Sequence, residues 1–166
     1  MNGFINTIDK LGDEVTASKI IDGTITEFLD NVITKMPSNA FRGRSALKVV
    51  NLPLITEIVS YAFQFCSALE VADFSSVEKI GISAFQSCSS LKALIIRTET
   101  VCVLLNYGWF SSTPIANGTG YIYVPRALVD SYKTATNWST YATQFRALED
   151  YTVDGTITGA LDESKI

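Results

Sequence analysis

The chain repeats itself every 22 residues, and this period constrains its fold more than any other feature. The dipeptide Ala-Phe occurs at Ala40-Phe41, Ala62-Phe63 and Ala84-Phe85. The same spacing links further apolar positions: Leu47, Leu69 and Leu91; Val50, Ala72 and Leu94; and Leu52, Phe74 and Ile96. A copy this short cannot bury its apolar side on its own, whereas stacked copies share one continuous core. The sequence therefore predicts a solenoid of stacked coils.

Each copy contains a short stretch with the spacing of a parallel strand. In residues 91–96 the apolar side chains follow the pattern L-x-x-L-x-L, which is typical of the strand in a leucine-rich repeat. Because side chains alternate along a strand, Leu94 and Ile96 are expected to point into the core, and Ala93 and Ile95 to the opposite face. The expected fold class is a leucine-rich repeat solenoid, mainly β or α/β. It has short parallel strands at a 22-residue period and helices that cap its C-terminal end.

Two copies carry a motif that resembles a known family. The motif is Ile-x-x-x-Ala-Phe-x-x-Cys-x-x-Leu, and it begins at Ile58 and again at Ile80. From residue 20 to about residue 150 the chain resembles the BspA-like leucine-rich repeat proteins, and its closing segment resembles the closing unit of those proteins. The first copy departs from the motif, because Arg44 stands where the later copies have Cys66 and Cys88. The resemblance implies a surface-binding or virion-associated module of gut bacteria, their phages or their prophages, rather than an enzyme.

The ends of the chain differ from the repeats, and we expect four segments. Residues 1–19 form an N-terminal arm or cap, residues 20–124 the solenoid, residues 125–150 a helical C-terminal cap, and residues 151–166 a tail. Counting back one period from Val50 places Phe28 in a first, partial strand within residues 21–29. Residues 98–119 keep their apolar content but stretch the period, as terminal repeats often do.

The predicted cap consists of two short helices. Pro125 suits the first turn of a helix that continues to Tyr132. The i, i+3, i+7 spacing of Trp138, Tyr141 and Phe145 predicts a second helix with one apolar side. Together these helices would cover the end of the stack and prevent edge-to-edge association.

The tail repeats the sequence Asp-Gly-Thr-Ile-Thr that also occurs at residues 22–26. The favoured interpretation is two similar openings of a turn and a strand. The alternative is that the tail adds a strand to its own chain or to a neighbouring chain.

Composition removes most catalytic and nucleic-acid-binding classes. The chain has no histidine, which excludes Ser-His-Asp and Cys-His catalysis and imidazole metal ligands. Its net charge of −4 argues against nucleic-acid binding. No apolar run reaches the ~18–20 residues that span a bilayer. The acidic residues of the repeats are spread out and form no evident carboxylate pair. We therefore expect no enzyme activity, no cofactor, no nucleic-acid partner and no membrane insertion.

The three cysteines are too few for a disulfide scaffold and lack the C-x-x-C spacing of a zinc site, so no metal site is expected. Cys66 and Cys88 lie one period apart, which makes a disulfide between neighbouring coils conceivable. Parallel side chains in a stack are poorly directed for such a bond, so buried thiols are the favoured interpretation. Cys102 is expected in register with Ile58 and Ile80, which also indicates the core.

The strand side chains that point away from the core form the predicted binding surface, because solenoids commonly present such a face to their partners. The candidate residues are Val49, Asn51, Val71, Asp73, Ala93, Ile95, Arg97, Tyr121 and Tyr123. The two tyrosines are amphipathic and suit contacts with protein or sugar. The alternative is a solvated sheet face whose aromatic residues only stiffen the last strand.

These features favour a non-catalytic binding module that recognises a ligand on a cell surface or a virion, such as a structural or receptor-binding protein of a phage or prophage. Its partner would be a protein or glycan of a cell surface, or another virion protein. The alternatives are a structural virion subunit whose termini mediate assembly, including as a homo-oligomer, and a fragment of a bacterial surface adhesin. The first residues lack the basic start and apolar stretch of a secretory signal. We therefore expect a location in a virion or at a cell surface, with no signal peptide in this chain.

Overall fold

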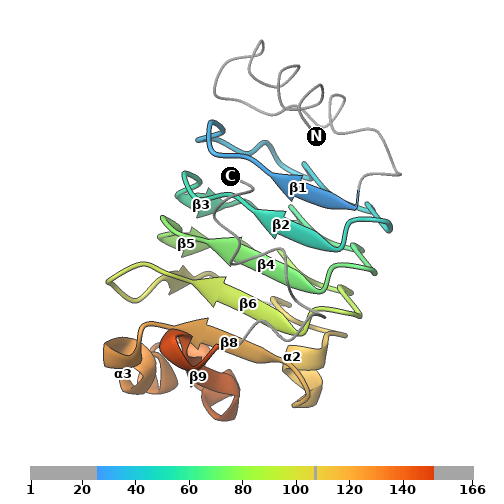
Figure 1. The fold of residues 1–166 in the computed structure, drawn as a ribbon. Coiled ribbons are helices and arrows are strands. Elements are labelled where there is room, and N and C mark those ends of the chain that lie inside the picture. The colour runs from blue at the N-terminus through green and yellow to red at the C-terminus, as the bar shows by residue number, and fades with distance from the viewer. Residues whose placement is uncertain (1–25, 107, 152–166) are drawn as a thin grey trace.

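The protein is a stack of coils in which two parallel sheets face each other across a hydrophobic core (Figure 1). The computed structural model describes residues 26–106 and 108–151. In spatial order, the larger sheet consists of β1 (Glu27–Leu29), β2 (Val49–Asn51), β4 (Val71–Phe74), β6 (Ala93–Ile96), β8 (Tyr121–Val124) and β9 (Phe145–Ala147). The smaller sheet consists of β3 (Glu57–Ile58), β5 (Lys79–Ile80) and β7 (Val103–Leu104).

The register of the larger sheet confirms the 22-residue period. Val50 pairs with Ala72, and Ala72 pairs with Leu94, so equivalent residues of successive copies lie side by side. Phe28 pairs with Val50, which confirms the first, partial strand. Leu94 and Ile96 point into the core as expected. The fold class, a leucine-rich repeat solenoid of short parallel strands, is confirmed.

One phenylalanine from each coil forms a continuous column through the core. The ring centroids of Phe41 and Phe63 lie 4.9 Å apart, and those of Phe63 and Phe85 lie 5.3 Å apart. Both pairs are stacked, with interplanar angles of 10° and 2°. Phe110 continues the column at 5.8 Å from Phe85. We call these four residues the phenylalanine column. Burial of each ring contributes ~1.5–3 kcal/mol, so the column accounts for a large share of the stability.

The period lengthens in the last coil, and this shifts one predicted position. Leu104, not Cys102, pairs with Ile80, so the predicted register of Cys102 is wrong. Extra residues in the loop before β7 move the chain forward by two positions relative to an unbroken period, and the sequence alone does not show where such an insertion lies. Cys102 is nevertheless buried, as expected, because it lies beside the core from a neighbouring position.

The cysteines are free thiols buried between the coils, which confirms the favoured interpretation. The thiol of Cys66 donates to the carbonyl of Phe41 at 2.9 Å, and Cys88 donates to Phe63 at 3.0 Å. Burial raises the pKa of the Cys66 thiol to about 12 and raises the pKa of Cys88 as well. These thiols therefore fill space and satisfy carbonyl groups between coils rather than react.

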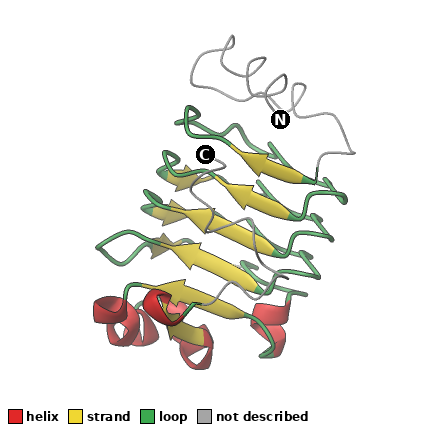
Figure 2. Ribbon diagram, in the orientation of Figure 1, coloured by secondary structure: helices red, strands yellow, loops and turns green. Residues whose placement is uncertain are grey.

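The C-terminal end of the stack is covered by short helices, which Figure 2 shows in red beside β8 and β9. They are α2 (Pro114–Asn117), η1 (Arg126–Leu128), α3 (Val129–Thr134), η2 (Trp138–Gln144) and η3 (Leu148–Asp150). Helices follow Pro125 as expected, and the side chain of Tyr132 is buried among the rings of the cap.

The predicted second helix ends earlier than its apolar spacing indicated. Phe145 begins β9 and pairs with Ile122 of β8, so its place in a helix with Trp138 and Tyr141 is corrected. The backbone at Tyr141 is already non-helical, with φ −109° and ψ 24°. Phe145 still packs on Trp138, with ring centroids 5.8 Å apart, because a sheet residue reaches the same core from the adjacent layer.

Side chains of the cap also close the outer edge of the smaller sheet. The indole nitrogen of Trp138 donates to the carbonyl of Cys102 at 2.6 Å, and the amide of Asn137 donates to Leu104 at 2.6 Å. The hydroxyl of Tyr132 accepts from the backbone N–H of Cys102 at 2.8 Å. These side chains take the place of a further strand, so the edge of β7 is closed to pairing with another chain.

The division into four segments remains a prediction. Most of the N-terminal arm or cap and of the tail falls outside the described residues, and so do both interpretations of the tail.

Candidate functional site

The outer face, which we define as the side of the larger sheet opposite the core, is far less exposed than the sequence predicts. Six of the nine candidate residues are buried: Val49, Asn51, Val71, Asp73, Ala93 and Ile95. The apolar members form a second hydrophobic cluster with Leu29 and Tyr151. Strands that are apolar on both faces are typical of sheets covered on both sides, so the runs in β4 and β6 already contained this signal. The expectation of an exposed array is therefore wrong for these six residues.

A buried ion pair joins two layers of the outer face. The carboxylate of Asp73 is fully buried and receives two hydrogen bonds from the Arg97 guanidinium, each 2.8 Å long. Arg97 itself remains partly exposed. Such a bidentate pair fixes both side chains in one geometry. These two candidates are brought together, and the contact gives them a structural role within the sheet.

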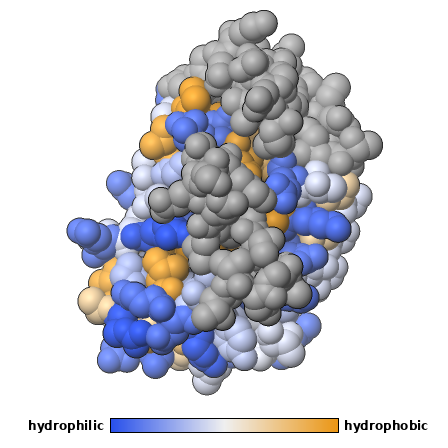
Figure 3. Space-filling model, in the orientation of Figure 1, coloured by the Kyte–Doolittle hydropathy of each residue, from blue (hydrophilic) through white to orange (hydrophobic). Residues whose placement is uncertain are grey.

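The remaining candidates, Tyr121 and Tyr123, lie half-buried on β8 at the cap end of the outer face. Their ring centroids are 6.4 Å apart, and Tyr123 packs edge-on against Tyr151 at 4.7 Å. The guanidinium of Arg146 lies 4.4 Å from the ring centroid of Tyr121. We call Tyr121, Tyr123 and Arg146 the tyrosine–arginine cluster. The surface around the cap is mainly hydrophilic (Figure 3).

Sequence reasoning missed Arg146 because it placed the surrounding residues in a helix. In the structure Arg146 lies on β9, directly opposite Tyr123 of β8. Only the parallel pairing of these two strands brings the cation next to the rings. The signal that could have found it is the alternation of Phe145, Arg146 and Ala147, which is buried, exposed, buried.

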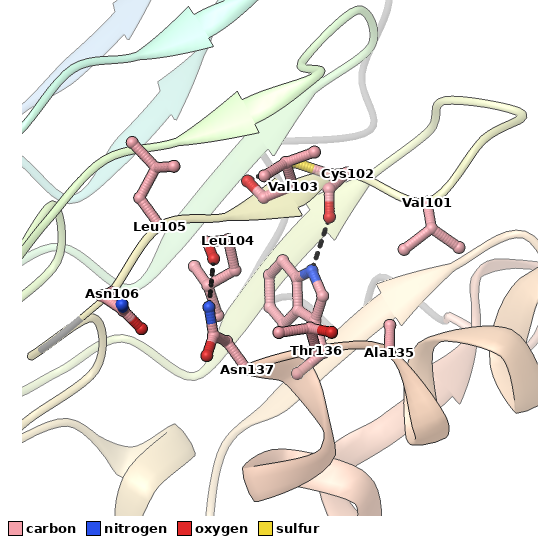
Figure 4. A pocket seen from close by; sticks show the side chains of 10 residues that line it. Val101, Cys102, Val103, Leu104, Leu105, Asn106, Ala135, Thr136 and Asn137 are labelled. Atoms are coloured by element: carbon pink, nitrogen blue, oxygen red, sulfur yellow. Dashed lines mark hydrogen bonds between the residues drawn. The ribbon is translucent and has the colours of Figure 1, made fainter.

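An open pocket of about 350 Å³ lies between β7 and the loop that precedes η2 (Figure 4). Its walls are mainly apolar and include Val101, Leu105 and Ala135. Among its lining residues the ionisable side chain is Cys102, and burial raises the pKa of this thiol to about 12. The pocket can receive a small apolar group, but its lining offers no group suited to proton transfer near neutral pH.

Within residues 26–106 and 108–151, no group of three acidic or cysteine side chains could hold a metal ion. No helix of the same residues has the length and apolar character to cross a membrane.

A family model called the BspA type leucine rich repeat region matches residues 23–120 of this chain, with six copies. The chain belongs to this family. No curated protein matches it. Leucine-rich repeats of the BspA type suggest a protein-binding module, and the family is typically non-catalytic. The match ends just before β8, so the tyrosine–arginine cluster lies in the part of the chain that follows the BspA-type repeats.

Proposed function

We propose that this BspA-type protein is a non-catalytic binding module that recognises a ligand on a cell surface or a virion. A phage or prophage setting is part of the proposal and rests on the resemblance of the repeats and of the closing segment. The observation that carries the proposal is the tyrosine–arginine cluster at the cap end of the outer face. Tyrosine and arginine are the residue types that most often supply binding energy at interfaces, because they combine apolar area with hydrogen-bonding groups.

The cluster is arranged before any ligand arrives. The guanidinium of Arg146 donates to the carbonyl of Thr143 at 2.9 Å and to the carbonyl of Phe145 at 2.7 Å. These bonds hold the cation over the ring of Tyr121. Side chains that are already fixed lose little conformational entropy on binding, so more of the contact energy contributes to affinity. A cation over an aromatic ring can meet both an acidic and an apolar group of a partner.

The test measures binding of the fluorescently labelled full chain to intact bacterial cells by flow cytometry. We expect saturable binding by the unchanged protein and loss of binding by the variant Tyr121→Ser/Tyr123→Ser. The variant Arg146→Gln keeps both rings and is expected to weaken binding in part. Leu54→Ser is the matched control, because it removes an exposed apolar side chain far from β8 in the chain. Thermal unfolding of each variant separates loss of binding from loss of folding.

Two results would contradict this proposal. One is equal cell binding by the unchanged protein and by folded Tyr121→Ser/Tyr123→Ser. The other is an absence of saturable binding across a panel of Gram-positive and Gram-negative gut bacteria.

A further inference from the structure

The turns that precede the strands of the larger sheet contain two columns of residues with left-handed backbone conformation. In Figure 1 these turns lie at the right, where the strands begin. The first column consists of Asn39, Tyr61, Ser83 and Gly108, with φ of 61°, 63°, 51° and 67°. The second consists of Gly43, Phe65, Ser87 and Ser112, with φ of 74°, 64°, 61° and 60°. Each coil therefore imposes the same unusual conformation twice.

Hydrogen bonds between coils hold this conformation in place. The backbone N–H of Tyr61 donates to the carbonyl of Ile82 at 3.0 Å, and that of Phe65 donates to Gln86 at 2.9 Å. Glycine and asparagine tolerate a positive φ, whereas a bulky side chain is unfavourable there. The other three coils accordingly have small or amide side chains at both positions.

The second coil departs from this pattern with two aromatic residues that gain little burial in return. The side chains of Tyr61 and Phe65 are 40% and 49% exposed, and neither belongs to a hydrophobic core cluster. The stack therefore tolerates these two aromatic rings at a conformational cost without using them for packing. Backbone strain of this kind is concentrated at functional sites.

The surface around the two rings carries positive charge alone. We define the turn face as residues 38–46, 60–68, 82–90 and 108–112. It contains Arg42 and Arg44 and no aspartate or glutamate. The guanidinium of Arg42 lies 5.7 Å from the ring centroid of Phe65. Neither arginine forms an ion pair with another residue in the part of the chain that the structure describes. A negatively charged partner therefore fits this surface.

The small exposed apolar area favours a sugar over a protein surface. An aromatic side chain presents ~150–250 Å² in all, so the exposed parts of the two rings total roughly 200 Å². A stable protein interface buries about 800 Å² on each partner. The rest of the turn face consists largely of serine, with the amides of Gln64 and Gln86 in contact at 2.5 Å. Exposed rings among hydroxyl and amide groups suit the apolar faces and hydroxyl groups of a sugar.

We propose that Tyr61, Phe65 and Arg42 form a site for an acidic oligosaccharide on the turn face. The rings stack on sugar faces, and the guanidinium pairs with a carboxylate or sulfate group. This site involves other residues and another part of the fold than the tyrosine–arginine cluster, so either proposal can fail while the other stands.

The repeat itself supplies the test substitutions. In the variant Tyr61→Asn/Phe65→Ser, each ring is replaced by the residue that a neighbouring coil has at the same position, namely Asn39 and Ser87. Titration calorimetry of the full chain uses three probes: hexagalacturonate, a sulfated heparin hexasaccharide and neutral maltohexaose. The first two distinguish carboxylate from sulfate as the recognised group. We expect binding of at least one acidic probe and no measurable binding of maltohexaose.

The variant is expected to lose at least about tenfold in affinity for the acidic sugar while its unfolding temperature stays the same or rises. Arg42→Gln is expected to weaken the same binding, and Val103→Thr, which changes an exposed apolar residue of β7, to leave it unchanged. The proposal is overturned if neither acidic sugar binds or if the variant binds as tightly as the unchanged chain. It is also overturned if the variant is clearly destabilised, or if a polyglutamate peptide binds this face more tightly than the sugars do.

Discussion

Phe63 occupies the middle of the phenylalanine column, and its replacement tests whether the column stabilises the stack. Its side chain is fully buried, with stacked neighbours at 4.9 and 5.3 Å and the tilted ring of Phe74 at 6.1 Å. Phe63→Ala removes the ring from all three neighbours and leaves a cavity. Substitutions of this kind cost ~3–5 kcal/mol, which is a large part of the ~5–15 kcal/mol that stabilises a typical domain.

For a domain of about this length, each kcal/mol lowers the unfolding temperature by ~2–4 °C. We therefore expect Phe63→Ala to unfold ~6–20 °C below the unchanged protein, as measured by circular dichroism and by urea titration. Phe65→Ala is the matched control, because it removes an equal ring two residues away from a side chain that is 49% exposed. The control is expected to change stability by less than about 0.5 kcal/mol. Equal effects of the two substitutions, or a shift below ~3 °C for Phe63→Ala, would refute the argument that the column stabilises the coils.

Three further outcomes are expected. Gly81→Ala should lower stability by ~1–3 kcal/mol in thermal unfolding, because the added methyl group would lie 2.5 Å from the backbone nitrogen of Ser60; an unchanged unfolding temperature would show that the backbone yields there. Asp73→Asn should cost ~3–5 kcal/mol because it leaves the Arg97 guanidinium without its buried counter-charge, and Arg97→Met in the same background should recover part of the loss. Cys66 should resist iodoacetamide at pH 8 in the native protein and react in urea, because burial raises its pKa to about 12 and keeps it protonated; rapid native labelling would contradict this.

The repeated part of the fold could be predicted because its period leaves few choices. Equivalent residues must coincide when coils stack, so the pairing of Val50 with Ala72 and the alignment of Phe41, Phe63 and Phe85 follow from spacing alone. Burial of Cys66 follows for the same reason.

The end of the stack could not be predicted in the same way. Trp138, Tyr141 and Phe145 have helical spacing, yet the chain leaves the helix at Gln144 because pairing with β8 is available to Phe145. The competition between a short helix and an added strand is decided by tertiary contacts, which local spacing does not contain. Arg146 was hidden for this reason.

The exposure of the outer face could not be predicted from alternation alone. A strand that is apolar on one face and mixed on the other leaves open whether the second face is covered. Val71, Ala93 and Ile95 belong to a second cluster that includes Tyr151, some sixty residues or more after β4 and β6 begin to form it. Contacts between residues so distant in the chain leave no periodic trace in the sequence.

Neighbouring coils are related by almost pure translation, since the rings of Phe63 and Phe85 differ in orientation by only 2°. A whole unit of 22 residues could therefore be duplicated or deleted between Phe41 and Phe85 without altering the geometry at either end. Each such event would move the cap by one strand spacing of about 4.8 Å. Evolution or an engineer could thus adjust the distance between two attached partners in fixed increments, as with the marks on a ruler.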